Sequence, residues 1–196
     1  MLIINNKKIL LVGDRKTGKS SLITTFGQHA FPTHALHDII DPHEYSTMYK
    51  GAEERYALWE CTSRDDTAHL RKLFYPDCEL FIIVYACNNP SSFLHAESVW
   101  VQDLQLNVPD VPYLLVATKI DLRDDKATID ALDVEEGRGP ITSEEGQLLA
   151  NRIGAIGYYE VSALNLDGVD ELFRSAVPHV FHPKDRSKGQ SRCAVM

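Results

Sequence analysis

The segment from Gly13 to Ser20 has the residue types and the spacing of a phosphate-binding loop. It reads Gly-Asp-Arg-Lys-Thr-Gly-Lys-Ser and follows an apolar, strand-like run from Ile9 to Val12. In such a loop, successive backbone N–H groups surround the phosphates, the lysine (Lys19) places a positive charge at the outer phosphates, and the hydroxyl (Ser20) ligates Mg²⁺. The pattern predicts a site for a nucleoside triphosphate. The expected contacts come from Gly13, Arg15, Lys16, Thr17, Gly18, Lys19, Ser20 and Ser21.

Four continuous apolar runs indicate the strands that must carry this loop. They cover Ile9 to Val12, Leu80 to Ala86, Tyr113 to Ala117 and Tyr158 to Val161, and each is followed by a polar loop and a helical pattern. Continuous hydrophobicity is typical of parallel strands that are covered on both faces. Tyr45 to Lys50 and Glu54 to Trp59 flank a short turn and predict a hairpin. We expect an α/β fold in which a mostly parallel six-stranded sheet has one antiparallel edge strand and helices on both faces.

Five helices are predicted between and after these strands. They cover Lys19 to Phe26, Thr67 to Phe74, Ser91 to Leu106, Ser143 to Ile153 and Val169 to Phe181. The fourth is preceded by Thr142, whose spacing to Glu145 is that of a capping box. Pro178 lies inside the last pattern and lacks a backbone donor, so we expect it to kink that helix or to end it near Val177.

Length and composition limit the class of protein. With 196 residues, 44% of them hydrophobic, the chain is long enough for one full core, and we expect one domain. The longest apolar stretch, Leu80 to Cys87, is too short to cross a bilayer, and the first residues lack the apolar segment of a secretory signal. We therefore expect a soluble intracellular protein. The spacing of Cys61, Cys78, Cys87 and Cys193 argues against disulfides and zinc.

Two further polar segments follow predicted strands directly. Thr118-Lys119-Ile120-Asp121 comes after the run that ends at Ala117, and Ser162-Ala163-Leu164 comes after Val161. Because the carboxyl ends of parallel strands meet at one edge of a sheet, these loops can converge with the phosphate loop on one nucleotide. In this order, the segments resemble the guanine-recognition loops of the Ras superfamily.

The resemblance is most specific to the Rho/Rac branch of small GTPases and covers nearly the whole chain. Branch-like features are Thr118, where most other Ras relatives have Asn, and the segment Leu122-Arg123-Asp124-Asp125-Lys126. It implies a Rho-like P-loop GTPase domain over residues 1–182, with an insert helix near 123–139. It also implies GTP or GDP with Mg²⁺ as cofactors.

The resemblance further assigns roles around the guanine base. The Asp121 carboxylate would accept two hydrogen bonds from guanine, the Lys119 stem would cover the ring, and the Ala163 N–H would bind the guanine oxygen. Phe31 resembles the aromatic residue that packs against the guanine edge; the alternative is an ordinary core phenylalanine. The predicted contacts at the base are Phe31, Thr118, Lys119, Asp121, Leu122, Ser162, Ala163 and Leu164.

The segments that sense and cleave the terminal phosphate depart from the family pattern. Asp38 stands where the first switch loop of the family has a Mg²⁺-binding Thr, with Thr33 as the alternative if that loop is shifted. Glu60-Cys61-Thr62-Ser63-Arg64 replaces Asp-Thr-Ala-Gly-Gln. The expected metal ligands are thus Ser20, Asp38 and, through a water molecule, Glu60.

Two arginines occupy positions that matter for hydrolysis. Arg64 replaces the Gln that orients the attacking water, and an arginine side chain has donors only, so it cannot accept a proton from water. Arg15 replaces a Gly and would crowd the terminal phosphate. No catalytic residue of the family is intact, so we predict slow or absent hydrolysis. The competing hypothesis is that Arg15 or Arg64 serves as an arginine finger in cis.

The end of the chain indicates a membrane anchor. Cys193-Ala194-Val195-Met196 is a C-a-a-X pattern, for which a terminal Met favours farnesyl on Cys193. Residues 183–196 are predicted to be a disordered tail. Lys184 to Arg192 carries a local charge of +3, which leaves −11 on the rest of a chain whose net charge is −8. The basic tail suits an anionic membrane, and the acidic body argues against nucleic acid.

These features together predict a monomeric signalling protein whose bound nucleotide controls effectors. We expect it at the cytoplasmic face of a membrane, with the plasma membrane as first candidate and a cytosolic pool. Its effector and regulator proteins are not named by the sequence.

Three alternatives follow from the same residues. A pseudo-GTPase scaffold would hold a structural nucleotide and present a constant interaction surface. A P-loop kinase acting on a small metabolite would leave the guanine loops and the C-a-a-X pattern unexplained. His34, His37 and His43 lie near Asp38 and Asp41, but we interpret them as solvated loop residues rather than a transition-metal site.

Overall fold

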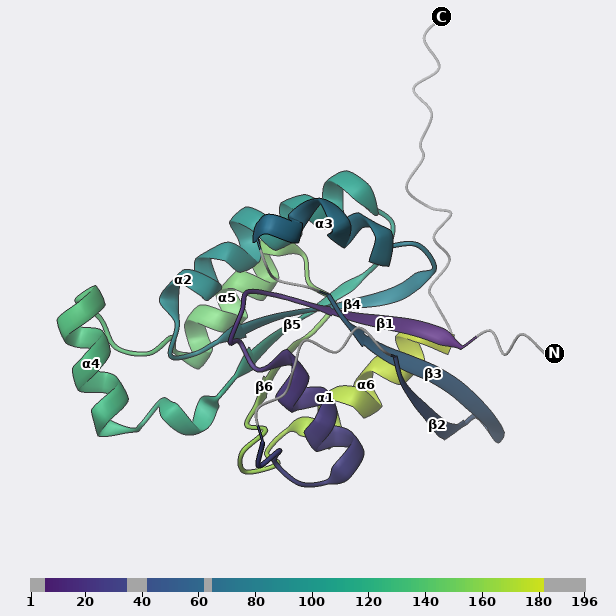
Figure 1. The fold of residues 1–196 in the computed structure, drawn as a ribbon, viewed down its shortest axis with the longest axis horizontal. Coiled ribbons are helices and arrows are strands. Elements are labelled where there is room, and N and C mark those ends of the chain that lie inside the picture. The colour runs from purple at the N-terminus through teal and green to yellow at the C-terminus, as the bar shows by residue number, and fades with distance from the viewer. Residues whose placement is uncertain (1–5, 35–41, 62–64, 182–196) are drawn as a thin grey trace, which may run out of the picture.

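One mixed sheet organises the molecule. The computed structural model describes residues 6–34, 42–61 and 65–181 (Figure 1). Six strands lie in the order β2-β3-β1-β4-β5-β6, and only the edge strand β2 runs antiparallel to its neighbour. They are β1 (Lys7–Val12), β2 (His43–Tyr49), β3 (Ala52–Glu60), β4 (Cys78–Ala86), β5 (Tyr113–Thr118) and β6 (Tyr158–Val161). The predicted fold class is confirmed.

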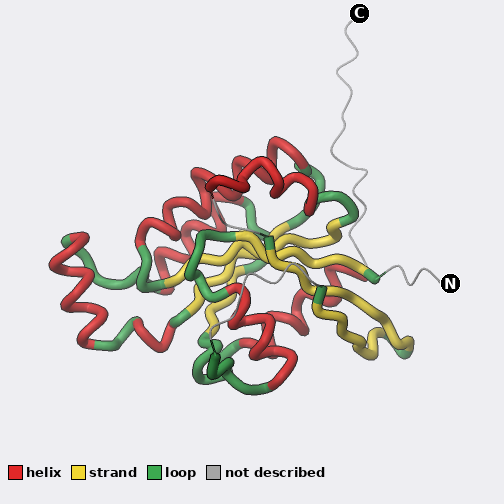
Figure 2. The backbone as a smooth tube through the Cα atoms, viewed as in Figure 1, coloured by secondary structure: helices red, strands yellow, loops and turns green. Residues whose placement is uncertain are grey.

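Helices cover both faces of this sheet. In the view of Figures 1 and 2, α1 and α6 lie below the sheet, whereas α2, α3 and α5 lie above it. Helix α4 lies at one side of the molecule, away from both layers, and falls within the segment 123–139. The α-helices are α1 (Lys19–Gln28), α2 (Pro90–His95), α3 (Gln102–Asn107), α4 (Lys126–Glu136), α5 (Ser143–Ile153) and α6 (Val169–Phe181).

The central strand β1 is covered on both faces of the sheet. Ile9 and Leu11 belong to the core between the sheet and helices α1 and α6. Leu10 and Val12 belong to the core between the sheet and helices α2, α3 and α5. All four side chains have no solvent exposure. Because β1 is covered on both faces, every position in the run is apolar.

The helical segments differ from the prediction in three places. The expected helix from Thr67 is a 3₁₀ helix, η1 (Asp65–Phe74). The expected helix over 91–106 contains a π-helical segment, η2 (Ala96–Val101), between α2 and α3. Helix α6 continues through Pro178 to Phe181, which confirms its predicted range; of the two expected effects of the proline, a kink or an end near Val177, the end is wrong. The apolar face of α6, which includes Val177 and Val180, is buried on both sides of the proline and maintains the helix.

Helix α5 begins as predicted. The Thr142 hydroxyl accepts from the Glu145 backbone N–H at 3.2 Å, and the Glu145 carboxylate accepts from the Thr142 N–H at 2.8 Å. These bonds satisfy two backbone donors that the first turn leaves without partners. The capping box thus fixes the start of α5 at the end of the loop that connects it to α4.

Candidate functional site

The phosphate loop has a backbone that only particular residues can adopt. It joins β1 to α1, beside the point where the strand order reverses between β1 and β4. Gly13 and Gly18 have φ angles of 148° and 90°. A Cβ atom on Gly13 would lie 2.2 Å from the Val84 carbonyl oxygen. The loop can therefore lie against β4 only with glycine at this position.

Lys19 is held by the loop itself. Its side chain is buried, and its ammonium donates to the backbone carbonyls of Gly13 and Asp14, each at 2.8 Å. The Thr17 hydroxyl donates to the same Asp14 carbonyl at 2.9 Å. These bonds fix the positive charge inside the loop, where a phosphate-binding lysine must lie.

Two of the three predicted metal ligands lie together. The Ser20 hydroxyl, at the start of α1, donates to the Glu60 carboxylate, at the end of β3, at 2.7 Å. The parallel pairing of Leu11 with Glu60 brings the end of β3 beside the phosphate loop. Hydroxyl and carboxylate oxygens are ligands that Mg²⁺ prefers, so this pair fits the ion. Asp38, His37 and Asp41 lie outside the described residues, as does Arg64.

The two segments predicted to contact the guanine base, 118–121 and 162–164, are called here the first and the second base loop. The first base loop is tied to the phosphate loop. The Thr118 hydroxyl lies 2.5 Å from the Thr17 carbonyl and 3.0 Å from the Tyr85 carbonyl, and it is placed to donate to either. Lys119, which follows, has a left-handed backbone with φ 59°, and its carbonyl accepts from the Cys87 thiol at 3.0 Å. Burial lowers the pKa of the Lys119 ammonium. The loop is thus fixed from two sides.

The second base loop is tied to the first. The Ser162 hydroxyl donates to the Asp121 carboxylate at 2.5 Å, and the Ser162 oxygen accepts from the Asn165 backbone N–H at 3.2 Å. The structure therefore brings Asp121, the predicted guanine ligand, next to the segment 162–164. Ser162 is fully buried and Asp121 is partly exposed, so the hydroxyl end of this hydrogen bond is fixed inside the protein while the carboxylate remains accessible to a ligand.

An ion pair behind the base loops was not predicted. Arg123 directly follows Leu122, and its guanidinium donates to both carboxylate oxygens of Glu160 in β6, at 2.6 and 3.1 Å. Burial opposes ionisation of Glu160, but the hydrogen bonds from Arg123 and Tyr158 outweigh it and hold the Glu160 pKa below its ordinary value. Spacing alone could not reveal this pair, because 37 residues separate its members.

The remaining predicted contacts lie at the protein surface. Phe31 is 42% exposed, so the alternative that it is an ordinary core phenylalanine is wrong. Arg15 and Lys16 are also exposed, and Lys16 has a positive φ of 62°. Ser21, Leu122 and Ala163 are partly exposed, and Leu164 is exposed. These side chains can meet a ligand without a change in the core.

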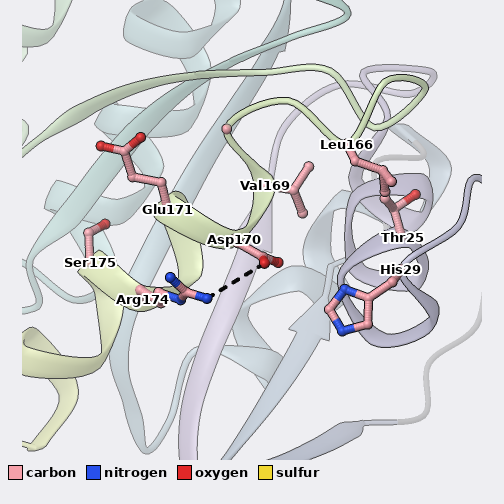
Figure 3. A pocket seen from close by; sticks show the side chains of 9 residues that line it. Thr25, His29, Leu166, Val169, Asp170, Glu171, Arg174 and Ser175 are labelled. Carbon is pink, nitrogen blue, oxygen red and sulfur yellow. Dashed lines mark ion pairs between the residues drawn. The ribbon is translucent and has the colours of Figure 1, made fainter.

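A groove of about 780 Å³ lies on another part of the surface. It runs between α1, the loop after β6 and the start of α6, and Figure 3 shows Thr25, His29, Leu166 and Asp170 around it. None of the predicted nucleotide contacts lines this groove. This groove is therefore separate from the converging loops.

The phosphate loop and the two base loops at the carboxyl edge of a parallel sheet define a P-loop nucleotide-site architecture. A model of the Ras family matches residues 8–182. The chain is 33% identical to the "GTP-binding protein RHO1" of Saccharomyces cerevisiae (strain ATCC 204508 / S288c) over 186 residues, which cover 95% of this chain and 88% of that protein. The chain belongs to the Ras family and is a Rho-type small GTPase.

Proposed function

We propose that this protein is a membrane-anchored, guanine-nucleotide-binding signalling protein that hydrolyses GTP slowly or not at all. Its bound state would control effector proteins. The observation that carries the proposal is the connection of the three loops: Thr118 to the phosphate loop, and Ser162 to Asp121. A single nucleotide can then contact all three loops at once. The yeast relative is called a GTP-binding protein, which supports the same ligand here.

Guanine recognition follows from the chemistry of Asp121. A carboxylate accepts hydrogen bonds only, and guanine offers it two donors from adjacent ring positions, whereas adenine offers no matching pair. Ser162 orients the carboxylate from one side. A base that leaves this carboxylate without partners should bind about 10²- to 10⁵-fold more weakly.

The phosphates and the metal would be held by the loop residues. Lys19, already fixed by two carbonyls, would supply charge to the outer phosphates. Ser20 would hold Mg²⁺ directly, and Glu60 would hold it through a water molecule. When bound, Mg²⁺ neutralises part of the phosphate charge. Asp38, proposed as a further ligand from the sequence, adds a carboxylate where the family has a neutral threonine.

Two residues that would lie near the terminal phosphate support slow hydrolysis. Arg15 is exposed at the tip of the phosphate loop, where its side chain would crowd an attacking water. Arg64 would leave that water without an acceptor to orient it. Without an oriented water, stabilisation of charge alone does not supply the geometry of in-line attack.

Single-turnover hydrolysis of GTP by the purified protein tests this proposal. The yeast RHO1 protein, assayed in parallel, provides the reference rate. We expect a rate at least tenfold lower than that of RHO1. A rate equal to that of RHO1 would contradict slow hydrolysis. The double variant Arg15→Gly with Arg64→Gln should hydrolyse GTP faster than the natural protein; no gain would indicate that Asp38 or Glu60 limits the reaction.

The nucleotide that copurifies with the protein separates this function from a pseudo-GTPase scaffold. Bound GTP that persists would support a locked form, and exchange with added GDP would support a switch. A scaffold should retain its nucleotide and bind the same partners in either state. Equal affinity for GDP and ATP, or no affinity for either, would refute guanine-nucleotide binding altogether.

A further inference from the structure

Asp14, the second residue of the phosphate loop, is held from outside the loop. Trp100 Nε1 donates to one carboxylate oxygen of Asp14 at 2.8 Å. The Nδ1 atom of His95 lies 2.6 Å from the other oxygen. Since a carboxylate only accepts, this short contact places a proton on Nδ1. Both oxygens of Asp14 are thereby directed toward α2 and η2.

The π-helical segment explains how both residues reach one carboxylate. His95 and Trp100 are five residues apart, and in an α-helix of 3.6 residues per turn such side chains point about 140° away from each other. In a π-helix the backbone bonds join residues five apart, which brings these side chains to nearly the same side. The segment Ala96–Val101, which follows His95 and contains Trp100, has this geometry.

Trp100 also connects the loop to η1. The Arg71 guanidinium of η1 lies over the Trp100 ring, 4.4 Å from its centroid. Arg71 and Trp100 are both buried, with 7% and 1% of their surface exposed. A guanidinium over an indole face is an attractive contact that strengthens away from water. The indole is therefore fixed on its face by η1 and at its N–H by Asp14.

Asp14, whose side chain is held by His95 and Trp100, in turn holds the Lys19 ammonium through its backbone carbonyl. The Asp14 carbonyl accepts from the Lys19 ammonium at 2.8 Å and from the Thr17 hydroxyl at 2.9 Å. A displacement of Asp14 would therefore move the charge that faces the phosphates. Its carboxylate, if released, would also be free to approach the phosphates and repel them.

We propose that His95 and Trp100 are positioning residues for the phosphates, acting through Asp14. This proposal rests on the proposed nucleotide binding and adds residues of α2 and η2, outside the three loops, to that site. Neither residue is among the predicted nucleotide contacts. They fix the Asp14 backbone that directs Lys19, and they direct the Asp14 carboxylate away from the ligand. Arg71 makes this arrangement sensitive to the position of η1.

The dissociation rate of fluorescently labelled GDP, at constant Mg²⁺, tests the proposal. Trp100→Phe retains a ring beside Arg71 but removes the N–H donor, and His95→Ala removes the second partner. Each should release GDP about tenfold faster. Leu94→Ala, at an exposed neighbouring position, is the matched control and should leave the rate unchanged. His95→Gln, which retains a side-chain donor, should restore part of the slow release.

Two further measurements separate positioning from a purely structural role. In an Asp14→Ala background, His95→Ala should cause no additional change in the GDP release rate. Thermal unfolding is measured for each variant without added nucleotide. The melting temperature of His95→Ala should remain close to that of the natural protein, since the His95 side chain is 47% exposed. Lower thermal stability without faster GDP release would overturn the proposal.

The outcome also distinguishes this proposal from the function on which it rests. Normal GDP binding by the natural protein, with release rates of both variants equal to the Leu94→Ala control, would overturn only the positioning role. Absence of GDP binding by the natural protein would overturn the proposed function and the positioning role together. If Trp100→Phe did not fold, the His95 variants would still decide the question.

Discussion

Single hydroxyl groups connect the parts of the nucleotide site. Thr118 joins the first base loop to the phosphate loop, and Ser162 joins the second base loop to Asp121. Both side chains are nearly or fully buried, so each bond replaces one that water would otherwise make. At this scale, loss of one oxygen atom should change ligand binding more than it changes the fold.

Ser162→Ala tests this expectation. The substitution removes the bond to Asp121, and the carboxylate should then be less well oriented toward guanine. Bonds to charged groups contribute about 1.5–3 kcal/mol, so we expect labelled GDP to dissociate at least tenfold faster. Ser98→Ala is a suitable control, because that exposed hydroxyl of η2 donates to the Leu94 carbonyl at the end of α2 and lies outside both base loops. An unchanged GDP release rate in Ser162→Ala would mean that Asp121 is oriented by other contacts.

At the scale of the elements, the ion pair of Arg123 and Glu160 joins segments that are distant in the chain. It connects the segment after β5 to β6, and the Arg123 Nε also donates to the Ile141 carbonyl at 3.1 Å, before α5. Tyr158 donates to Glu160 at 2.7 Å. The base loops are therefore supported from behind by a connected set of polar contacts rather than by apolar packing alone.

Glu160→Gln should lower stability in a pH-dependent manner. The Glu160 pKa is held below its ordinary value of 4.5, so its contribution is fully present above that value and is lost as pH falls through the native pKa. At pH 7 we expect the variant to lose about 1–2 kcal/mol of unfolding free energy in urea. The difference from the natural protein should shrink below pH 4.5. A difference that stayed constant down to pH 3 would contradict the assignment.

Pro178→Ala addresses helix α6 as an element. Pro178 is exposed and lacks the backbone donor that the carbonyl four residues earlier would receive. Alanine restores that donor and sacrifices little packing, so the unfolding free energy should rise by about 2 kcal/mol. Urea unfolding measures the change. Lower stability in the variant would show that the proline ring contributes more than its missing donor costs.

The whole molecule divides its charge between an acidic body and a basic tail. Among the described residues, no helix combines the length and the apolar composition required to span a bilayer. The proposed attachment rests instead on the C-a-a-X pattern at Cys193 and on the basic residues before it, which lie outside the described residues. One prenyl chain anchors weakly, so the lysines and arginines of the tail would provide the second attraction.

Cys193→Ser tests the anchor in cells. Without a prenyl acceptor, the protein should move from the membrane fraction to the cytosolic fraction, while GDP binding by the purified protein remains unchanged. Cys78→Ser, a buried cysteine in β4, is the control for loss of a thiol elsewhere. Retention of the Cys193→Ser variant in the membrane fraction would show that prenylation is not what holds it there.

The amino-acid sequence by itself was enough to predict the central strands, their burial on both faces and the positions of the three loops in the chain. Ile9 to Val12 and Leu80 to Ala86 are apolar at every position, and this local signal depends only on neighbouring residues. The glycines of the phosphate loop are also a local signal, because each is required by the positive φ angle of its own backbone. The order of the motifs then sufficed to bring them to one edge of the sheet.

Tertiary structure alone decided which distant side chains support the site. Asp14 meets His95 and Trp100 across 81 and 86 residues, and no periodicity links them. The π-helical turn that aligns these two partners has no pattern of its own, since the same sequence reads as an ordinary amphipathic helix. Local patterns report backbone preference and burial, whereas hydrogen bonds between elements depend on how the packed layers align, which only the folded chain establishes.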